Sequence, residues 1–381
     1  MANLADLIIK NGLVYTPNGF VKKNLCITGG KIASAVTDNA EIIDAKGGYV
    51  CSGFIDIHTH GGAGVDVNSA DEEGAGKIRR FFASSGVTAF YASIAADSKE
   101  NTMRAIGVWR NEMKKPGIGA EVLGIHLEGP FLSADHAGAI DTGNLRNPDQ
   151  QLFEEYLNAG EGAVRYVTIA PELPGAISLI ERYSARLTFA IGHSGADYPT
   201  AITANKAGAK SVTHLFNAMV PFRHREPGIL GAASDSDMTC ELICDGRHVD
   251  PSAIRIALKC MGLDRVAAVT DSMQAAGMQD GEYVLAGRPV TVKGPDALLH
   301  DGTRAGSLLT MDRALANLMN FAGLSLKEAL PLLTANPAEV ARVGNRKGSL
   351  EEGKDADIVI LRRDCSVYAT IASGITVFPQ I

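Results

Sequence analysis

Apolar positions in the middle of the chain occur in short runs that alternate with longer amphipathic stretches. Between Gly53 and about Asn345, β-branched and apolar runs typical of buried strands are separated by segments with helical periodicity, such as residues 71–86 and 199–209. The eight runs are GFIDIH, VTAFYAS, EVLGIHLE, VRYVTIAP, LTFAIGHS, SVTHLF, CELICDG and RVAAVTD. Strands alternating with helices in this way predict an α/β fold, a (β/α)8 barrel, whose usual size of about 250 residues fits this span.

Both ends of the chain have short alternating runs separated by Asn-Gly and Gly-Gly turns, which is the pattern of a small β-sheet. We therefore expect residues 1–52 and 348–381 to form one small β-sandwich domain together. Residues 53–347 are expected to form the barrel. The stretch 282–300 reads as a hairpin, inserted after the last barrel strand.

Composition narrows the possible partners. The 381 residues are 46% hydrophobic and 21% charged, which is typical of a globular protein and excludes a disordered or fibrous one. A net charge of -7 argues against broad binding of nucleic acid or of an anionic membrane, so an anionic ligand needs a local cationic pocket. The sequence has neither an apolar run of membrane-spanning length nor a signal-peptide pattern, and we expect a cytoplasmic protein.

The cysteines are few and scattered, which predicts reduced thiols rather than a disulfide framework. Cys240 and Cys244 have a spacing that occurs in metal sites. Because no Cys-x-x-Cys partner exists, buried packing is the better interpretation.

The first predicted barrel strand ends in a His-x-His pattern. The two-residue period of a strand puts Asp56, His58 and His60 on one face, so the two imidazoles converge. Neutral imidazole is a good ligand for zinc and related metals, which makes this strand end a candidate metal site. The alternative is an ordinary pair of surface or core histidines.

Other strand ends carry similar chemistry. His126 and Glu128 share a strand face, and the carboxylate that ends this strand is the better ligand candidate, with His126 expected in the core or behind a ligand. His193 and His214 each lie where an apolar run meets a polar loop. Asp271 ends the last strand, where a lone aspartate is otherwise often a helix N-cap. Carboxylates and imidazoles from five strand ends would meet at the face where barrel enzymes carry their sites.

Taken in order, these motifs resemble the N-acetylglucosamine-6-phosphate deacetylases of the amidohydrolase superfamily along nearly the whole chain. HLEGPF, GHS, THLFNAM and REPG are the most specific matching blocks, and GFIDIHTHGG, VTIAPE, DGRHVD, VTDS, GSLLTM, NPA and GSLEEGKDADIVIL also match. The resemblance implies metal-dependent removal of the acetyl group from N-acetylglucosamine 6-phosphate by the barrel domain.

The resemblance also implies roles for particular residues. Glu128, His193 and His214 hold a divalent metal, expected to be zinc, and Asp271 handles the proton. His58 and His60 are retained, so a second metal that shares Glu128 is expected to be possible. For the sugar phosphate, the resemblance implies Asn217, Ala218, Arg225 and His248. In this family the arginine can come from the neighbouring subunit, which implies a homodimer.

The chain departs from the family pattern after HLEGPF. The family usually has a basic residue and then Gly-Ala-His or Gly-Thr-His, whose histidine lies near the acyl group, whereas this chain has Ile140 at the histidine's place. Isoleucine neither donates a hydrogen bond nor carries charge. Either the metal or a shifted group such as His136 polarises the carbonyl, or the preferred substrate is a related N-acyl amino-sugar phosphate such as N-acetylgalactosamine 6-phosphate.

Two further classes remain open from the sequence. Dihydroorotase-like enzymes typically bridge their metals with a carboxylated strand lysine, but no strand-end lysine is evident and Glu128 stands at the bridging position. A non-catalytic scaffold of the same fold is expected to lose metal ligands, and this sequence retains them.

Overall fold

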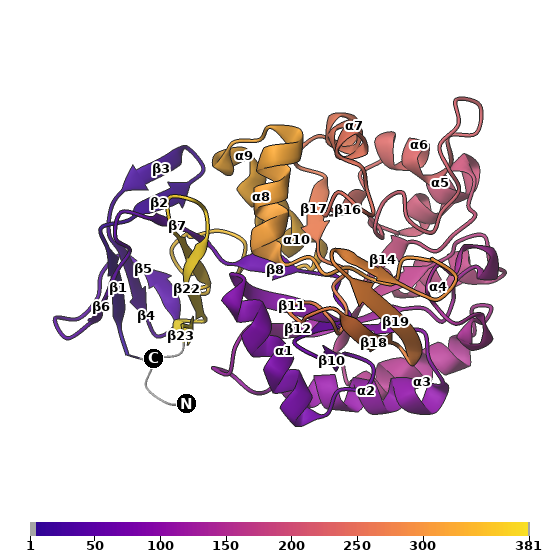
Figure 1. The fold of residues 1–381 in the computed structure, drawn as a ribbon, viewed down its shortest axis with the longest axis horizontal. Helices are drawn as coiled ribbons and strands as arrows, with labels where there is room; N and C mark the ends of the chain where they lie inside the picture. Colours follow the sequence, from indigo (N-terminus) through magenta and orange to yellow (C-terminus); the bar gives the residue numbers. More distant parts are fainter. Residues whose placement is uncertain (1–4, 380–381) are drawn as a thin grey trace.

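The centre of the molecule is a nearly closed barrel of eight parallel strands. The computed structural model describes residues 5–379 (Figure 1). The strands follow one another around the barrel in sequence order: β8 (Phe54–Asp56), β11 (Val87–Ala95), β12 (Glu121–Glu128), β13 (Val164–Ile169), β14 (Thr188–Ile191), β15 (Ser211–Val212), β16 (Thr239–Ile243) and β17 (Val266–Val269). Just beyond the first and last strands, the Asp271 amide donates to the carbonyl of His58 at 2.9 Å, which brings these two strand ends together. The predicted (β/α)8 barrel is confirmed, with each of the eight apolar runs forming one strand.

Helices cover the outside of the barrel (Figure 1). They are α1 (Glu72–Ser84), α2 (Lys99–Glu112), α3 (Gln150–Gly160), α4 (Ala176–Tyr183), α5 (Tyr198–Ala207), α6 (Gly228–Ser234), α7 (Pro251–Met261), α8 (Met311–Ala322), α9 (Leu326–Leu333) and α10 (Ala335–Val340). Several begin at an aspartate or serine whose side chain accepts a backbone N–H of the first turn, as Asp71 does from Gly74. In α1, Ile78 and Phe82 lie on the buried face one helical turn apart, as the periodicity predicts.

The barrel interior changes from aromatic to polar toward the carboxyl ends of the strands. Tyr91 and Tyr166 stack with their ring centroids 5.8 Å apart. Above them, His126 contacts Ser93 Oγ at 2.9 Å and Thr168 Oγ1 at 2.8 Å through its two ring nitrogens. This buried polar layer supports the side chains at the barrel mouth, and both nitrogens of His126 are occupied by it.

The two ends of the chain build the β-structure beside the barrel (Figure 1). One sheet has the order β5 (Lys31–Ala33), β4 (Leu25–Thr28), β1 (Leu7–Lys10), β6 (Glu41–Asp44). The other has the order β23 (Ile375–Phe378), β22 (Val367–Ala372), β21 (Ile358–Leu361), β7 (Tyr49–Ser52), β2 (Leu13–Thr16), β3 (Gly19–Lys22). Antiparallel pairing of β7 with β21 joins the N-terminal and C-terminal segments. Apolar side chains of both sheets, such as Ile9, Ile27 and Ile360, share one buried core.

A three-stranded antiparallel sheet follows β17 where the sequence predicts a hairpin. It consists of β18 (Gly281–Leu285), β19 (Arg288–Lys293) and β20 (Asp296–Leu298). Arg288 donates from Nη1 to the carbonyl of Ala139 at 2.9 Å, so this insertion is tied to the loop after β12. A short pair, β9 (Gly61–Gly62) with β10 (Val65–Asp66), lies after the first barrel strand.

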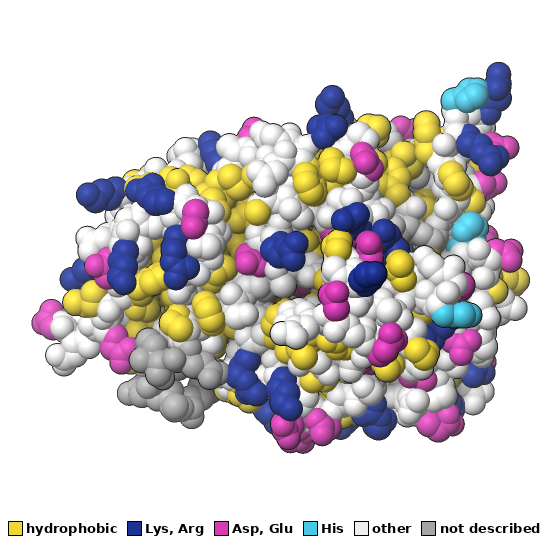
Figure 2. Space-filling view, in the orientation of Figure 1, with side chains coloured by type: hydrophobic (Ala, Val, Ile, Leu, Met, Phe, Trp, Pro, Cys, Tyr) yellow, Lys and Arg dark blue, Asp and Glu magenta, His cyan; other side chains and the backbone are white. Residues whose placement is uncertain are grey.

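Charge is dispersed over the surface, and acidic and basic side chains are interspersed on the face seen in Figure 2. All six cysteines are free thiols. Within residues 5–379, no helix has the length and apolar character required to cross a bilayer.

Candidate metal centre

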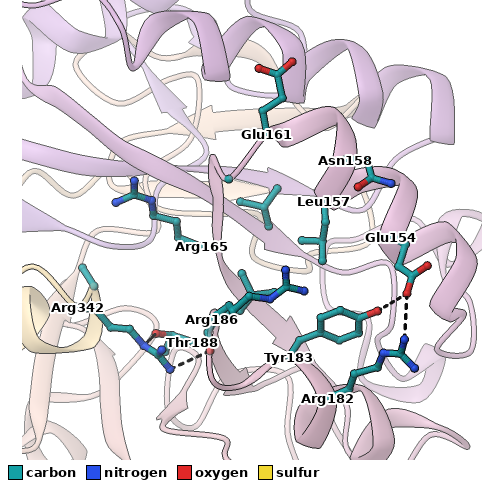
Figure 3. Close-up of a pocket in the computed structure, with 14 residues that line it drawn as sticks. Glu154, Leu157, Asn158, Glu161, Arg165, Arg182, Tyr183, Arg186, Thr188 and Arg342 are labelled. Carbon is teal, nitrogen blue, oxygen red and sulfur yellow. Dashed lines mark hydrogen bonds and ion pairs between the residues drawn. The ribbon is translucent and has the colours of Figure 1, made fainter.

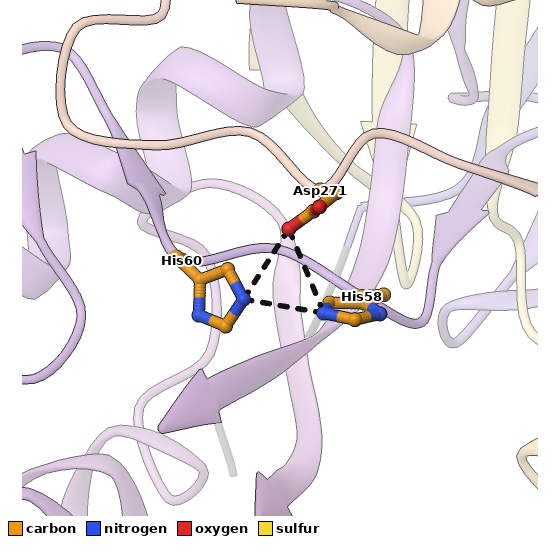
Figure 4. A group of neighbouring side chains, drawn as sticks. All are labelled: His58, His60 and Asp271. Carbon is orange, nitrogen blue, oxygen red and sulfur yellow. Dashed lines mark hydrogen bonds and ion pairs between the residues drawn. The ribbon is translucent and has the colours of Figure 1, made fainter. Parts of the chain in front are cut away.

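Six predicted site residues meet at the carboxyl ends of the barrel strands. They fall into two groups of potential ligands: His58, His60 and Asp271 (Figure 4), and Glu128, His193 and His214. All six are largely buried, and Asp271 is the most exposed at 8%. The structure therefore brings together the residues that the strand-end pattern singled out.

Glu128 links the two groups. Its Oε1 lies 3.2 Å from Nε2 of His193, 3.3 Å from Nε2 of His214 and 3.3 Å from Nε2 of His58. Its Oε2 lies 3.1 Å from Nε2 of His60. One carboxylate thus faces all four imidazoles, which is the position of a bridging ligand.

The imidazoles face one another in a way that favours a cation between them. Nδ1 of His193 lies 2.9 Å from the carbonyl of His136, and Nδ1 of His60 lies 3.0 Å from the carbonyl of Ser93. A carbonyl only accepts, so each Nδ1 carries a proton, and Nε2 is the atom that offers a lone pair to a metal when the imidazole is neutral. The Nε2 atoms of His193 and His214 are 3.0 Å apart, and those of His58 and His60 are 3.2 Å apart.

These separations fit coordination to a metal. Tetrahedral zinc with Zn–N bonds of about 2.0–2.1 Å keeps its ligand atoms roughly 3.3 Å apart. The Nε2 atoms of His193 and His214 are 3.0 Å apart, and the carboxylate oxygens of Glu128 lie 3.1–3.3 Å from the imidazole nitrogens that they face. The donor set and its spacing fit a divalent metal, as the sequence predicts.

The backbone conformation of three of these residues directs their side chains into the mouth of the barrel. His193 has φ 47°, His214 has φ 27° and Asp271 has φ 47°, all in the left-handed region that side chains rarely adopt. Each lies two residues after the end of its strand, and its side chain faces the other potential ligands at the mouth of the barrel. Such conformations cost free energy and cluster at functional sites.

Carboxylates give the centre a strong preference for positive charge. Burial alone lowers the pKa of His60, but the carboxylates of Glu128 and Asp271 overcome this and raise it to about 10. Burial alone raises the pKa of Asp271, yet His58 and His60 lower it to about 2. The site is therefore arranged to stabilise a cation beside ionised carboxylates.

Glu241 supports the centre from inside the barrel, and sequence reasoning missed it. Its Oε2 lies 2.8 Å from Nδ1 of His58 and accepts the His214 backbone N–H at 3.1 Å, while its Oε1 accepts from Tyr166 Oη at 2.5 Å. It is completely buried. A charged residue inside the otherwise apolar run CELIC was the available signal.

A cavity of about 200 Å³ opens beside Glu128, His193 and His214. Its lining includes three of the predicted substrate-binding residues, Asn217, Ala218 and His248. Residues that the sequence analysis did not single out also line it: Gly138, Ala139, Leu285, Thr303, Arg304 and Gly306. Arg304 brings a positive charge that is paired with Asp296 at 2.9 Å.

Ile140 lines the same cavity and is 7% exposed. Its side chain packs with Ala96 and Leu132 in a small apolar cluster. The wall at this position is thus apolar. His136 contributes its backbone carbonyl to His193, while its imidazole is not among the groups that line the cavity.

Arg225 lies outside this cavity. It is exposed, its Nη1 is 2.7 Å from Nε2 of the neighbouring His224, and it lines a separate cavity with Tyr198 and Val220. The loop between β15 and α6 that carries it projects from the barrel in Figure 1. Within one chain, Arg225 is therefore not brought together with the other predicted substrate-binding residues.

Comparisons with known proteins agree with this geometry. The Amidohydrolase family model matches residues 49–377. The N-acetylglucosamine-6-phosphate deacetylase of Bacillus subtilis (strain 168) is 37% identical, covering 97% of this chain and 96% of the relative. An N-acetylgalactosamine-6-phosphate deacetylase from Escherichia coli O157:H7 is 32% identical over 93% of this chain and 94% of its own.

Two solved structures are also similar to this chain along nearly its whole length. N-acetylglucosamine-6-phosphate deacetylase from Pasteurella multocida superimposes with a TM-score of 0.92 at 29% identity, covering 97% of this chain and 99% of its own. A mutant of the Mycobacterium smegmatis enzyme in complex with N-acetyl-D-glucosamine-6-phosphate has a TM-score of 0.90 at 32% identity, covering 98% and 99%.

Proposed function

The chain belongs to the amidohydrolase family, and we propose that it hydrolyses N-acetylglucosamine 6-phosphate to glucosamine 6-phosphate and acetate. The observation that carries this proposal is the contact of Glu128 with four imidazoles at the mouth of the barrel. In this proposal residues 53–347 are the catalytic domain, and residues 1–52 with 348–381 form the accompanying β domain.

In this proposal Glu128, His193 and His214 would hold one divalent metal. His58 and His60, which also face Glu128, would hold a second and more weakly bound one. Four nitrogen donors with carboxylate oxygen favour zinc. When bound, a divalent metal lowers the pKa of coordinated water and polarises an acyl oxygen.

Asp271 is the proposed proton carrier. Its Oδ1 lies 3.3 Å from Nε2 of His60, and its lowered pKa keeps the carboxylate ionised at neutral pH. It accepts a proton from the attacking water and delivers it to the leaving nitrogen, since an amine leaves only when protonated. One water is consumed: its oxygen enters acetate, and the C–N bond breaks as the nitrogen gains the proton.

Asn217, Ala218 and His248 are proposed to contact the sugar phosphate, because they line the cavity beside the metal residues. Arg225 is proposed to bind the 6-phosphate from a second copy of the chain, as its guanidinium is exposed on a projecting loop. This implies a homodimer. The absence of a membrane-spanning helix among the described residues is compatible with the cytoplasmic location that we propose.

Turnover of a panel of N-acyl hexosamine 6-phosphates, with metal analysis of the same preparation, tests the proposal. We expect acetate release from N-acetylglucosamine 6-phosphate and loss of activity after chelation. Faster turnover of N-acetylgalactosamine 6-phosphate would favour the second candidate, which the apolar wall at Ile140 and the Escherichia coli relative support. A metal-loaded protein that turns over no member of the panel would contradict the deacetylase proposal and favour a non-catalytic scaffold.

A further inference from the structure

A glutamate outside the metal centre joins the residues that follow two neighbouring barrel strands. β13 and β14 run parallel, with Ile169 opposite Ile191 at their carboxyl ends. Glu172 lies three residues after β13, and His193 lies two residues after β14. The proposed function gives Glu172 no role, although it ends the VTIAPE block.

Glu172 binds the turn that follows His193. Its Oε2 accepts from the hydroxyl of Ser194 at 2.7 Å, and its Oε1 accepts from the backbone N–H of Gly195 at 2.6 Å. Oγ of Ser194 in turn accepts from the backbone N–H of Ala196 at 3.0 Å. The carboxylate thus holds three successive residues in place, through hydrogen bonds of the strong, charge-assisted kind.

This turn leaves little room for His193 to move. Ser194 is completely buried, and a Cβ added at Gly195 would lie only 3.0 Å from Nε2 of His136. The backbone carbonyl of His136 accepts from Nδ1 of His193 at 2.9 Å. Because His193 has the costly backbone angle φ 47°, contacts on both sides of it must offset that cost. The Glu172 turn supplies the contacts on the carboxyl side.

The same turn reaches a proposed substrate contact. The Ser194 N–H donates to the carbonyl of Ala218 at 3.1 Å, and Ser194 forms a parallel bridge with Met219. Ala218 lines the cavity beside the metal residues. One carboxylate therefore supports both a proposed metal ligand and the loop that borders the substrate cavity.

A different group fixes the amino end of β14. Arg342 donates from Nε to Oγ1 of Thr188 at 3.2 Å and from Nη2 to the carbonyl of Leu187 at 3.0 Å. Arg342 and Thr188 lie there at the edge of a cavity of about 890 Å³ (Figure 3). Loss of the Glu172 contacts should therefore loosen the turn after β14 without releasing the strand itself.

We propose that Glu172 is a positioning residue that holds His193 in the orientation that binds metal. This inference rests on the proposed function, because it concerns the metal assigned there to Glu128, His193 and His214. Partners behind metal ligands fix ligand orientation and tune metal affinity by about 10–100-fold. Glu172 acts through the backbone of the turn rather than on the imidazole, so the effect belongs at the lower end of this range.

Competition of the metal-loaded protein with a chelator of known affinity tests the proposal. Glu172→Gln keeps the side chain's size but replaces one accepting oxygen with an NH2 group, which cannot accept from Ser194 or Gly195. Because Glu172 is exposed, the variant buries no unpaired group. We expect this metal to bind about tenfold more weakly. The melting temperature at saturating metal should fall by no more than about 4 °C, which weaker metal binding alone accounts for.

Two further variants make the test specific. Glu181→Gln, an exposed glutamate of α4, is the matched control and should keep wild-type metal affinity. Ser194→Ala removes the hydroxyl that donates to Glu172 and provides a double-mutant cycle. If Glu172 acts through this turn, the double variant weakens metal binding by less than the product of the two single effects.

Four results overturn the proposal: unchanged metal affinity in Glu172→Gln, equal weakening in Glu181→Gln, a double variant at the full product, or a larger fall in melting temperature, which makes Glu172 a structural residue. A wild type that takes up no metal overturns the proposed function together with this inference. A wild type that binds metal while Glu172→Gln behaves identically overturns this inference alone.

Discussion

Nδ1 of His58 lies 2.8 Å from Oε2 of Glu241, although the two residues stand 183 positions apart in the chain. The first and seventh barrel strands bring them together below the metal residues. The contact leaves Nε2 of His58 facing His60 and Glu128. A buried carboxylate therefore orients an imidazole whose other nitrogen points into the metal centre.

Glu241→Gln keeps the shape of this side chain but removes its charge. We expect the metal held by His58 and His60 to bind about 10–100-fold more weakly, because partners behind the ligands tune metal affinity by this amount. The metal held by Glu128, His193 and His214 should stay. Metal content after dialysis against a weak chelator measures both, with the exposed Glu100→Gln as control. Full retention of both metals would contradict a positioning role for Glu241.

Glu128 and His58 should differ in their effect on metal content. Glu128→Ala is expected to release both metals and abolish activity, since this carboxylate faces all four imidazoles. His58→Ala should lose only the more weakly bound metal. Elemental analysis gives the stoichiometry, and His300→Ala, an exposed histidine, serves as control. Full activity in a metal-free preparation would contradict the proposed metal-dependent mechanism.

Asp271→Asn tests proton transfer. Asparagine keeps the side chain's shape but cannot accept a proton, so kcat should fall at least about 10²-fold while KM changes little. The metal content of this variant must be measured alongside, because Asp271 lies within 3.6 Å of His58 and 3.3 Å of His60. A variant that holds its metal and turns over at full speed rules out Asp271 as the proton carrier.

Much of the barrel follows from the sequence because parallel strands are buried on both faces and read as continuous apolar runs. The strand-end residues follow for the same reason, since carboxyl ends of parallel strands meet at one face. The contact of Glu241 with His58 does not follow, because no local pattern gives the partner of a buried charge 183 residues away. The sequence does not predict Arg304 as a cavity residue, for a related reason. Arg304 enters the cavity from beyond the inserted sheet, and its pairing with Asp296 depends on the turn between them.

Arg225 is a different case, because one chain does not place it at the metal centre. Arg225→Ala should weaken turnover of 6-phosphorylated substrates far more than that of unphosphorylated ones, because it removes the guanidinium that we propose binds the phosphate. Arg223→Ala, in the same loop and paired with Glu226, is the matched control. Equal losses on both substrate types would make Arg225 structural.

Mixing the Arg225→Ala and Asp271→Asn chains distinguishes the source of the arginine. If Arg225 reaches a neighbouring subunit, a mixed dimer regains one complete site, with Asp271 from one chain and Arg225 from the other. If it acts within its own chain, the mixture stays as inactive as its components. We expect activity to recover on mixing. Mass spectrometry confirms that the subunits have exchanged.

Ile140 lies in the wall of the cavity beside Glu128, His193 and His214. The side chain packs with Ala96 and Leu132 and presents only apolar surface to the cavity. Ile140→Val keeps the wall apolar and should therefore change turnover of N-acetylglucosamine 6-phosphate by less than about tenfold, since the loss of one buried methylene costs about 0.5–1.5 kcal/mol. Ile140→His adds a donor beside the proposed acyl position and is expected to preserve or raise kcat/KM on this substrate, provided that the melting temperature shows an intact fold.

If Ile140 instead marks a changed substrate, the wild type turns over N-acetylglucosamine 6-phosphate poorly and another N-acyl amino-sugar phosphate well. A wild type that is fast on N-acetylglucosamine 6-phosphate rejects the changed-substrate interpretation, because an apolar residue at this position then suffices for the proposed reaction.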